Sequence, residues 1–253
     1  MSYIGTNKIG KMYLGSTAIA KAYLGDNLVY VAEPPDTTLI AYWNGSDAAV
    51  SKNWSDRIGN KRWKIYDTYT KGTNYYQFNN VASSNQFATL TDNDFGVNYE
   101  IKVVVDFELN PDGTNNMVVF DFGGYGVTAS GNWGFCAYRQ GSSGNWFAVP
   151  KYNGNNSVSY TASGTPPVME NGTWTAGTVE AGIELNGAED KQRVFLKIGD
   201  YSIVSDWKDK IKLKAFAAAG NNARLATTCF GTGSTAYSRS RVRIKSIKVF
   251  NEV

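Results

Sequence analysis

The clearest pattern in the chain is a strict alternation of apolar and polar positions between residues 99 and 109. Apolar side chains occupy every second position from Ile101 to Leu109, and polar or charged side chains fill most positions between them. This period of two is that of a β-strand with one buried face. Similar patterns predict further strands at residues 39–43, 61–66, 117–122, 134–139, 178–185, 193–198, 212–217 and 242–250. Since no stretch shows a capped 3.6-residue period, we predict an all-β protein.

The spacing of these strands predicts a particular β architecture. Turns rich in Gly and Asn separate them, and about eight to fourteen antiparallel strands over roughly 215 residues fit a two-sheet jelly-roll sandwich. The last strand changes phase: Arg243 and Lys245 put polar side chains at odd positions, whereas Ile247 and Val249 put apolar ones there. A β-bulge near Ser246 would bring both apolar halves to the same face.

The first thirty residues form an internal repeat. Gly5, Gly15 and Gly25 fall in register with a period of ten, and the residues around them match from one repeat to the next. Glycine followed by a small polar residue is typical of a tight hairpin turn. We therefore predict a small N-terminal β-ribbon at residues 1–32, in the form of a three-stranded meander.

This ribbon is too small to be stable alone, since about thirty residues bury little apolar area. One interpretation is a hairpin folded onto the main domain. The interpretation that we favour is an anchor, which docks on a partner and holds a symmetric homo-oligomer, a trimer in our prediction. The residues expected to make these anchoring contacts are Ile9, Tyr13, Ile19, Tyr23 and Leu24. Pro34 and Pro35 stiffen a linker at residues 33–37, and the jelly-roll domain is expected at residues 38–253.

Composition excludes several kinds of site. The chain has no His, so it lacks a Ser-His-Asp triad and His-ligated zinc, and its two Cys are too few for a four-thiolate metal site. We predict no cofactor and no resident metal. The net charge of +3 is too small to indicate nucleic acid as a partner. The N-terminus has no apolar signal-peptide region, and no apolar run predicts membrane insertion.

Asp106 and Glu108 are the candidate catalytic pair if the chain is an enzyme. They lie two residues apart on the strongest predicted strand, and retaining glycosidases need two carboxyl groups about 5–5.5 Å apart. The same face carries Lys102, however, as an ordinary solvated face would. We therefore predict a protein without enzymatic activity.

Aromatic residues indicate a different role. The chain has seven Trp and 16 Tyr, and several of them lie in polar segments that resemble turns. An exposed ring beside amide side chains is well suited to hold a sugar, because the ring contacts the apolar sugar face while the amides bind hydroxyls. The residues that we predict to bind glycans in this way are Trp54, Trp133 and Trp146, each flanked by Asn or Gly. The opposing interpretation places these rings between the two sheets.

Two family resemblances follow from these motifs. The repeat, with its core Lys-Met-Tyr-Leu-Gly-Ser-Thr-Ala-Ile-Ala-Lys-Ala-Tyr-Leu-Gly, resembles N-terminal segments of virion proteins from phages of gut Bacteroidales, the crAss-like phages among them. The remainder, from Leu39-Ile-Ala-Tyr-Trp-Asn-Gly to Val242-Arg-Ile-Lys-Ser-Ile-Lys-Val-Phe-Asn, resembles the concanavalin A-like/laminin-G-like superfamily. That resemblance implies a two-sheet jelly roll whose members often bind glycans. The Glu-x-Asp-x-x-Glu motif of the family's glucanases is missing, which argues against hydrolysis.

These observations lead to one main hypothesis. We expect a non-enzymatic virion protein, a head or tail fibre or a decoration protein, made in the host cytoplasm without a signal peptide. Its N-terminus would dock on other virion proteins, and its jelly roll would face outward and bind host surface polysaccharide. The alternatives are a capsular polysaccharide depolymerase on the same fold and a bacterial carbohydrate-binding lectin.

Overall fold

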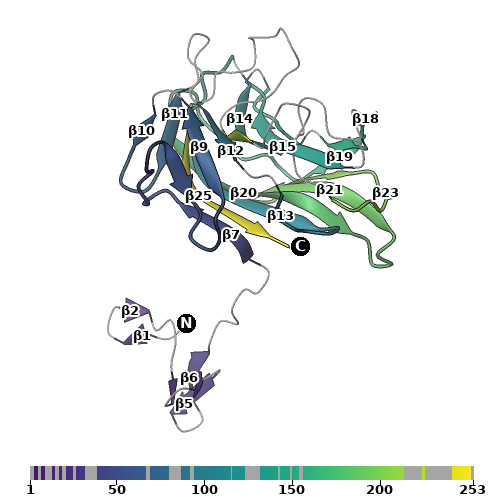
Figure 1. The fold of residues 1–253 in the computed structure, drawn as a ribbon. Coiled ribbons are helices and arrows are strands. Elements are labelled where there is room, and N and C mark those ends of the chain that lie inside the picture. The colour runs from purple at the N-terminus through teal and green to yellow at the C-terminus, as the bar shows by residue number, and fades with distance from the viewer. Residues whose placement is uncertain are drawn as a thin grey trace. The chain divides into compact units, whose positions relative to one another are not determined.

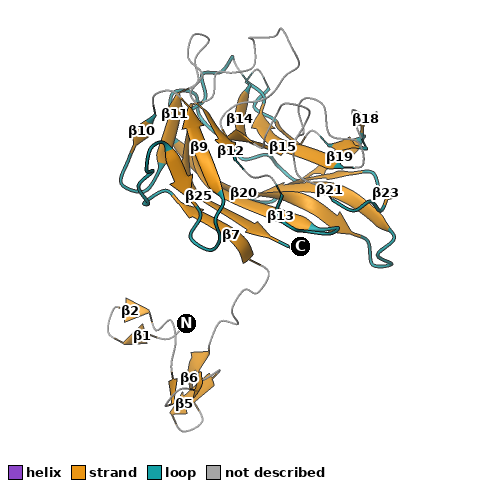
Figure 2. Cartoon of the chain, in the orientation of Figure 1, coloured by secondary structure: helices purple, strands orange, loops and turns teal. Residues whose placement is uncertain are grey.

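In a computed structural model, the chain divides into two compact units, Met1–Thr38 and Leu39–Val253. Within residues 39–251 the structure describes all but 67–68, 80–86, 92–93, 115, 123–131, 142, 149, 154–155, 214–223 and 226–240. Before residue 39 it describes the backbone of six short strands. Figure 2 shows strands and loops and no helix in the described part of the chain. No described segment is therefore a helix long and apolar enough to span a bilayer.

The described strands of the N-terminal unit form three hairpins, one for each repeat. The strands pair as β1 (Tyr3–Ile4) with β2 (Asn7–Lys8), β3 (Tyr13–Leu14) with β4 (Thr17–Ala18), and β5 (Lys21–Leu24) with β6 (Asn27–Val31). Each pair is a separate two-stranded sheet among the described residues, so the three-stranded meander that we predicted is wrong. Two residues separate the strands of each pair, which is the length of the tightest hairpin loop.

The second unit contains two large antiparallel sheets (Figure 1). The first has the strand order β10-β11-β25-β13-β20-β21-β22-β19, with β7 also paired to β25 and β23 to β21. Its strands are β7 (Leu39–Asn44), β10 (Thr70–Lys71), β11 (Tyr76–Asn79), β13 (Ile101–Leu109), β19 (Tyr160–Ser163), β20 (Thr175–Leu185), β21 (Lys191–Ile198), β22 (Tyr201–Ser205), β23 (Lys208–Asp209) and β25 (Arg241–Phe250).

The second sheet has the order β18-β17-β15-β14-β24-β12-β9-β8, with β16 also paired to β15. Its strands are β8 (Asn53–Ser55), β9 (Arg62–Tyr66), β12 (Phe87–Leu90), β14 (Met117–Phe122), β15 (Trp133–Arg139), β16 (Trp146–Ala148), β17 (Lys151–Tyr152), β18 (Asn156–Ser157) and β24 (Arg224–Leu225). The predicted all-β, two-sheet jelly-roll sandwich is thereby confirmed.

Aromatic pairs cross the core between the two sheets. The rings of Trp54 on β8 and Tyr76 on β11 have centroids 4.7 Å apart, and those of Trp146 on β16 and Phe107 on β13 are 5.6 Å apart. Both tryptophans therefore join one sheet to the other. Aromatic pairs at this distance contribute to stability beyond the area that they bury.

The strand predicted at residues 212–217 is wrong where it can be compared, because residues 212 and 213 are not in a strand. Residues 214–217 lie outside the described residues.

A β-bulge interrupts the pairing of β13 with β25. Asp106 pairs with Ser246, but the next residue, Phe107, pairs with Ile244, so that Lys245 is the extra residue. The bulge predicted near Ser246 is confirmed. Because a bulge redirects the side chains on either side of it, Ile244 and Ile247 both reach the core.

Candidate functional site

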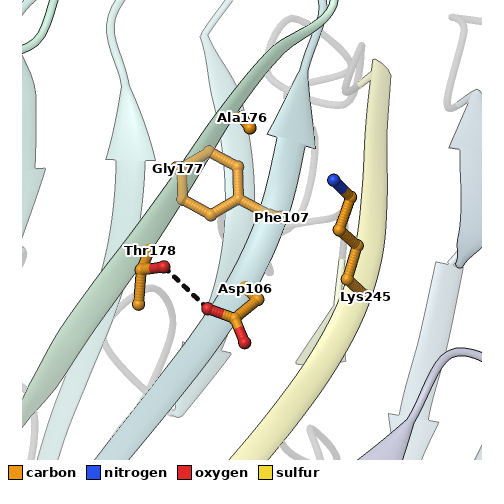
Figure 3. A pocket seen from close by; sticks show the side chains of 6 residues that line it. All are labelled: Asp106, Phe107, Ala176, Gly177, Thr178 and Lys245. Atoms are coloured by element: carbon orange, nitrogen blue, oxygen red, sulfur yellow. Dashed lines mark hydrogen bonds between the residues drawn. The ribbon is translucent and has the colours of Figure 1, made fainter. Parts of the chain in front are cut away.

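A shallow hollow lies beside this bulge, on the solvent side of the first sheet (Figure 3). It has a volume of about 380 Å³ and is lined by Asp106, Phe107, Ala176, Gly177, Thr178 and Lys245. These residues come from three neighbouring strands, β13, β20 and β25. A Cβ atom at Gly177 would lie 2.8 Å from Cζ of Phe107, so only glycine leaves room for that ring.

Asp106 is held in place by two hydroxyl groups. Thr178 donates a hydrogen bond of 2.6 Å to Oδ1, which Figure 3 draws, and Ser246 donates one of 2.6 Å to Oδ2. Both donors stand directly opposite Asp106 in the sheet, one on each neighbouring strand. The carboxylate is therefore fixed at the base of the hollow.

Glu108 lies two residues further along the same face of β13 and is paired with two cations. Its carboxylate is 2.5 Å from Nζ of Lys245 and 2.9 Å from Nη1 of Arg243. Burial raises the pKa of Glu108, but the hydrogen bonds from Lys245 and Arg243 outweigh it and hold that pKa below its ordinary value. Glu108 is therefore ionised at neutral pH and engaged on both oxygens.

Two aromatic rings lie against the guanidinium of Arg243, which is paired with Glu108. The guanidinium of Arg243 lies 3.9 Å from the ring centre of Trp174 and 4.5 Å from that of Tyr75. Its Nε also donates a hydrogen bond of 2.8 Å to Oε1 of Gln77. Both rings are half-buried, and Trp174 directly precedes β20, two residues before Ala176 of the hollow. We call the hollow with Trp174, Tyr75, Arg243 and Glu108 the bulge patch.

The three tryptophans predicted to bind glycans are in the core instead. Trp54, Trp133 and Trp146 are each 0% exposed, so the prediction that their rings are open to a sugar is wrong. Each of them bridges the two sheets: Nε1 of Trp133, for example, donates a hydrogen bond of 3.1 Å to Gln192 on β21. Flanking Asn and Gly residues indicate a turn nearby, but they do not determine the direction of the ring.

The remaining predicted site residues have different outcomes. Asp106 and Glu108 do lie on one face of β13, with the partners given above. Ile9 and Ile19 lie outside the described residues, and Tyr13, Tyr23 and Leu24 lie on strands whose backbone alone is described. Their anchoring role stays a prediction. No cluster of three or more metal-ligating His, Cys, Asp or Glu side chains occurs in the described part of the chain.

Sequence reasoning singled out Asp106 and Glu108 of the bulge patch but not its two aromatic residues. Trp174 and Tyr75 belong to the group of aromatics in polar segments, but nothing in the sequence separates them from the buried tryptophans. The available signal was the phase change in β25, since bulges are common beside functional sites. The alternating cations Arg243 and Lys245 directly precede that change.

Comparison with known proteins supports the fold. No family model and no curated protein matches this sequence. Among solved structures, a Trypanosoma rangeli sialidase in complex with 2,3-difluoro-KDN resembles 92% of this chain with a TM-score of 0.51 and 11% identity. The match covers 34% of the sialidase chain, so this protein spans about a third of that length.

Two botulinum neurotoxin structures are also similar. One is a type C structure whose title describes an interaction with two ganglioside molecules, at 9% identity, with a TM-score of 0.46, over 86% of this chain and 48% of that one. The other is a serotype DC binding domain in complex with rat synaptotagmin II, at 7% identity, with a TM-score of 0.44, over 86% and 49%. At these identities the likeness concerns the fold alone, an antiparallel β-sandwich of two sheets.

Proposed function

We propose that this protein is a non-enzymatic glycan-binding protein of a bacteriophage particle, and that the bulge patch is its sugar-binding surface. The observation that carries this proposal is the hollow of about 380 Å³, which is lined by the fixed Asp106 carboxylate, the Thr178 hydroxyl and the Lys245 side chain. Sugar hydroxyl groups need both donors and acceptors, and this hollow offers both. The half-buried ring of Trp174 beside it supplies a surface for the apolar face of a sugar.

The same geometry supports binding without hydrolysis. A general acid must keep its proton at the working pH, which requires a raised pKa. The ion pairs of Glu108 lower its pKa instead, and both oxygens of Asp106 already accept hydrogen bonds from Thr178 and Ser246. We therefore favour recognition over the alternative of a depolymerase that uses Asp106 and Glu108.

The virion assignment rests on the N-terminal repeat and its resemblance to phage virion proteins. In this proposal residues 1–32 dock on the particle and hold a homotrimer, and the jelly roll faces host polysaccharide. A ring–sugar contact contributes about 1 kcal/mol, as other ring contacts do, so one site binds weakly. Many copies on one particle would raise the overall affinity by multivalency.

The binding test uses the full chain and host capsular polysaccharide. Ala176 is exposed and lines the hollow, so Ala176→Trp fills it without disturbing the core. Lys197→Trp is the matched control, because Lys197 is exposed on β21 on the same face of the sheet, outside the hollow. We expect Ala176→Trp to abolish binding in biolayer interferometry and Lys197→Trp to leave it unchanged. Equal binding by both variants would contradict the proposed site.

Two further measurements separate the alternatives. A release of reducing ends or unsaturated sugars from the polysaccharide above background would identify an enzyme. Immunogold labelling of phage particles with an antibody to this chain should decorate the head or the tail, whereas labelling confined to bacterial cells would favour the lectin alternative. Light scattering of the intact chain is expected to give a trimer, and a monomer would contradict the oligomer.

A further inference from the structure

The strand β19 is an exposed edge of the first sheet (Figure 1). It pairs with β22 on one side, and no described strand pairs with it on the other. All four of its residues, Tyr160–Ser163, are exposed. An open edge presents a row of unpaired N–H and C=O groups, which can pair with a further strand. Such an edge is an interaction surface unless the chain protects it.

β19 lacks the usual protection. Proteins commonly protect an edge strand with a charged side chain, a proline or a β-bulge. Residues 152–169 contain no charged residue, although 19% of the chain is charged. Within β19 there is no proline, and its pairing with β22 runs without a register shift. At the opposite end of the same sheet, by contrast, the edge strand β10 carries the exposed Lys71.

The pairing of β19 with β22 determines which of its backbone groups point outward. The N–H of Asp206 donates a hydrogen bond of 3.0 Å to the carbonyl oxygen of Ser159. Every second residue of an antiparallel strand bonds the same neighbour, so Thr161 also bonds β22. The N–H and C=O groups of Tyr160 and Ala162 therefore point to the open edge.

We propose that β19 pairs with β19 of a second copy of this chain, in antiparallel orientation about a two-fold axis at Thr161. In this register Tyr160 lies opposite Ala162 of the other copy, and the two residues exchange N–H···O=C bonds in both directions. Because one position separates the two outward residues, the edge is complementary to itself. The absence of charge in residues 152–169 also removes electrostatic repulsion between the copies.

The side chains fit the same register. Tyr160 and Ala162 point to one face of the strand, so the small side chain of Ala162 leaves room for the Tyr160 ring of the other copy. That ring is 39% exposed in the single chain, and the contact would cover it. On the other face Thr161 stands opposite its own symmetry mate, and threonine pairs across antiparallel strands are favourable.

The contact is suited to copies that are already held close together. Two four-residue strands bury far less area than a stable dimer needs, so the pairing is weak in dilute solution. Copies attached side by side have a high effective concentration, which favours the pairing. A two-fold contact cannot lie within a three-fold trimer, so it would join a copy in one trimer to a copy in the next.

The pairing also has a consequence for the bulge patch. The two-fold axis of an antiparallel pair is perpendicular to the sheet, so the solvent faces of the two first sheets point the same way. Both bulge patches would then contact one surface, which increases multivalent binding. The pairing itself does not depend on sugar binding, so the failure of either proposal leaves the other testable.

Disulfide cross-linking of the full chain tests the register. Cys229→Ser is made first, so that the buried Cys136 is the only native thiol. Thr161→Cys then places two thiols opposite each other at a pair whose Cα atoms are about 4.5 Å apart, which a disulfide can span. Thr165→Cys is the matched control, because Thr165 is exposed but lies beyond the strand.

We expect mild oxidation to give a disulfide-linked dimer with Thr161→Cys and little dimer with Thr165→Cys. No dimer with Thr161→Cys would overturn the inference. Equal yields from both variants would indicate random collision and would overturn it as well.

Sedimentation velocity at increasing concentration gives a second measurement without oxidation. Ala162→Pro removes an outward N–H and leaves the bonds to β22 in place, since proline is tolerated on an edge strand whose N–H faces solvent. It should weaken self-association by about tenfold, because each copy loses one hydrogen bond of the pair. Ala162→Ser keeps the N–H and should associate as the wild type does.

Thr161→Lys provides an independent variant that keeps every backbone hydrogen bond. It brings two positive charges together at the two-fold axis, and like charges directly opposite each other destabilise a strand pair. We expect it to weaken self-association at an unchanged melting temperature, while Thr165→Lys has no effect. If Ala162→Pro and Thr161→Lys both associate as the wild type does, the inference is refuted.

Discussion

Replacing Trp54 by Ala tests whether the tryptophans flanked by Asn are structural. The indole is fully buried, its ring centre lies 4.7 Å from that of Tyr76 on the opposite sheet, and its Nε1 donates a hydrogen bond of 3.0 Å to the Asn44 carbonyl oxygen. Truncating a buried Trp costs about 3–5 kcal/mol, and the lost hydrogen bond adds about 1 kcal/mol. For a domain of this size each kcal/mol lowers the melting temperature by roughly 2–4 °C. We therefore expect a fall of about 10–20 °C.

Calorimetry of the wild type and of this variant measures the effect. Trp207→Ala is the matched control, since its indole is 39% exposed and its main partner is the Arg193 guanidinium, 4.3 Å from the ring centre. Loss of that cation–π contact should cost about 1 kcal/mol or less. If Trp54→Ala melts within a few degrees of Trp207→Ala, the ring of Trp54 does not hold the two sheets together. The assignment of Trp54 to the core between the sheets then fails.

A milder pair of substitutions isolates the hydrogen bond. Trp54→Phe leaves the Asn44 carbonyl without its indole donor, whereas Nε1 of Trp146 has no hydrogen-bond partner among the described residues. Removing a paired buried group costs more than removing an unpaired one. We expect Trp54→Phe to lower the free energy of unfolding by about 1 kcal/mol more than Trp146→Phe does. The reverse order in urea denaturation would contradict this reasoning.

Three other predictions concern polar groups. Gln192→Leu should cost about 3 kcal/mol in urea denaturation, because Gln192 is fully buried and hydrogen-bonds Trp133 and the backbone of Tyr99 and Ile211. The lowered pKa of Glu108 should contribute stability that is present at neutral pH and lost as the pH falls below about 4.3, and Glu108→Gln should abolish that part of the pH profile. Arg139→Met should raise the free energy of unfolding by about 1 kcal/mol, since Nε and Nη1 of Arg139 are buried donors without a partner among the described residues. A free energy of unfolding below that of the wild type would contradict this reasoning.

The sequence by itself determined the strands and the class of fold. Strict alternation from Ile101 to Leu109 identified a strand with one buried face, and the structure places that strand in the middle of the larger sheet. The phase change between Lys245 and Ile247 likewise identified the bulge. Both are local signals, because a period of two and its interruption are read from neighbouring positions without knowledge of the partner strand.

Tertiary structure alone decided which aromatic rings are exposed. Trp54 and Trp174 both lie in polar segments, yet Trp54 is buried between the sheets and Trp174 lies half-buried beside Arg243. The difference depends on which residue stands opposite across the core or beside it in the sheet, and that partner is distant in the sequence. Local composition therefore predicted the presence of turns and left the direction of the ring undetermined.

Tertiary structure also decided how the charged groups are paired and buried. The sequence placed Asp106 and Glu108 on one face, but their hydroxyl and cationic partners lie on strands far along the chain, and those partners decide how each carboxylate is engaged. No sequence feature marks Arg139 as buried, yet it is only 7% exposed and donates a hydrogen bond to the Met169 carbonyl oxygen, thirty residues away. Burial and pairing are properties of contacts between distant segments, so only the folded chain specifies them.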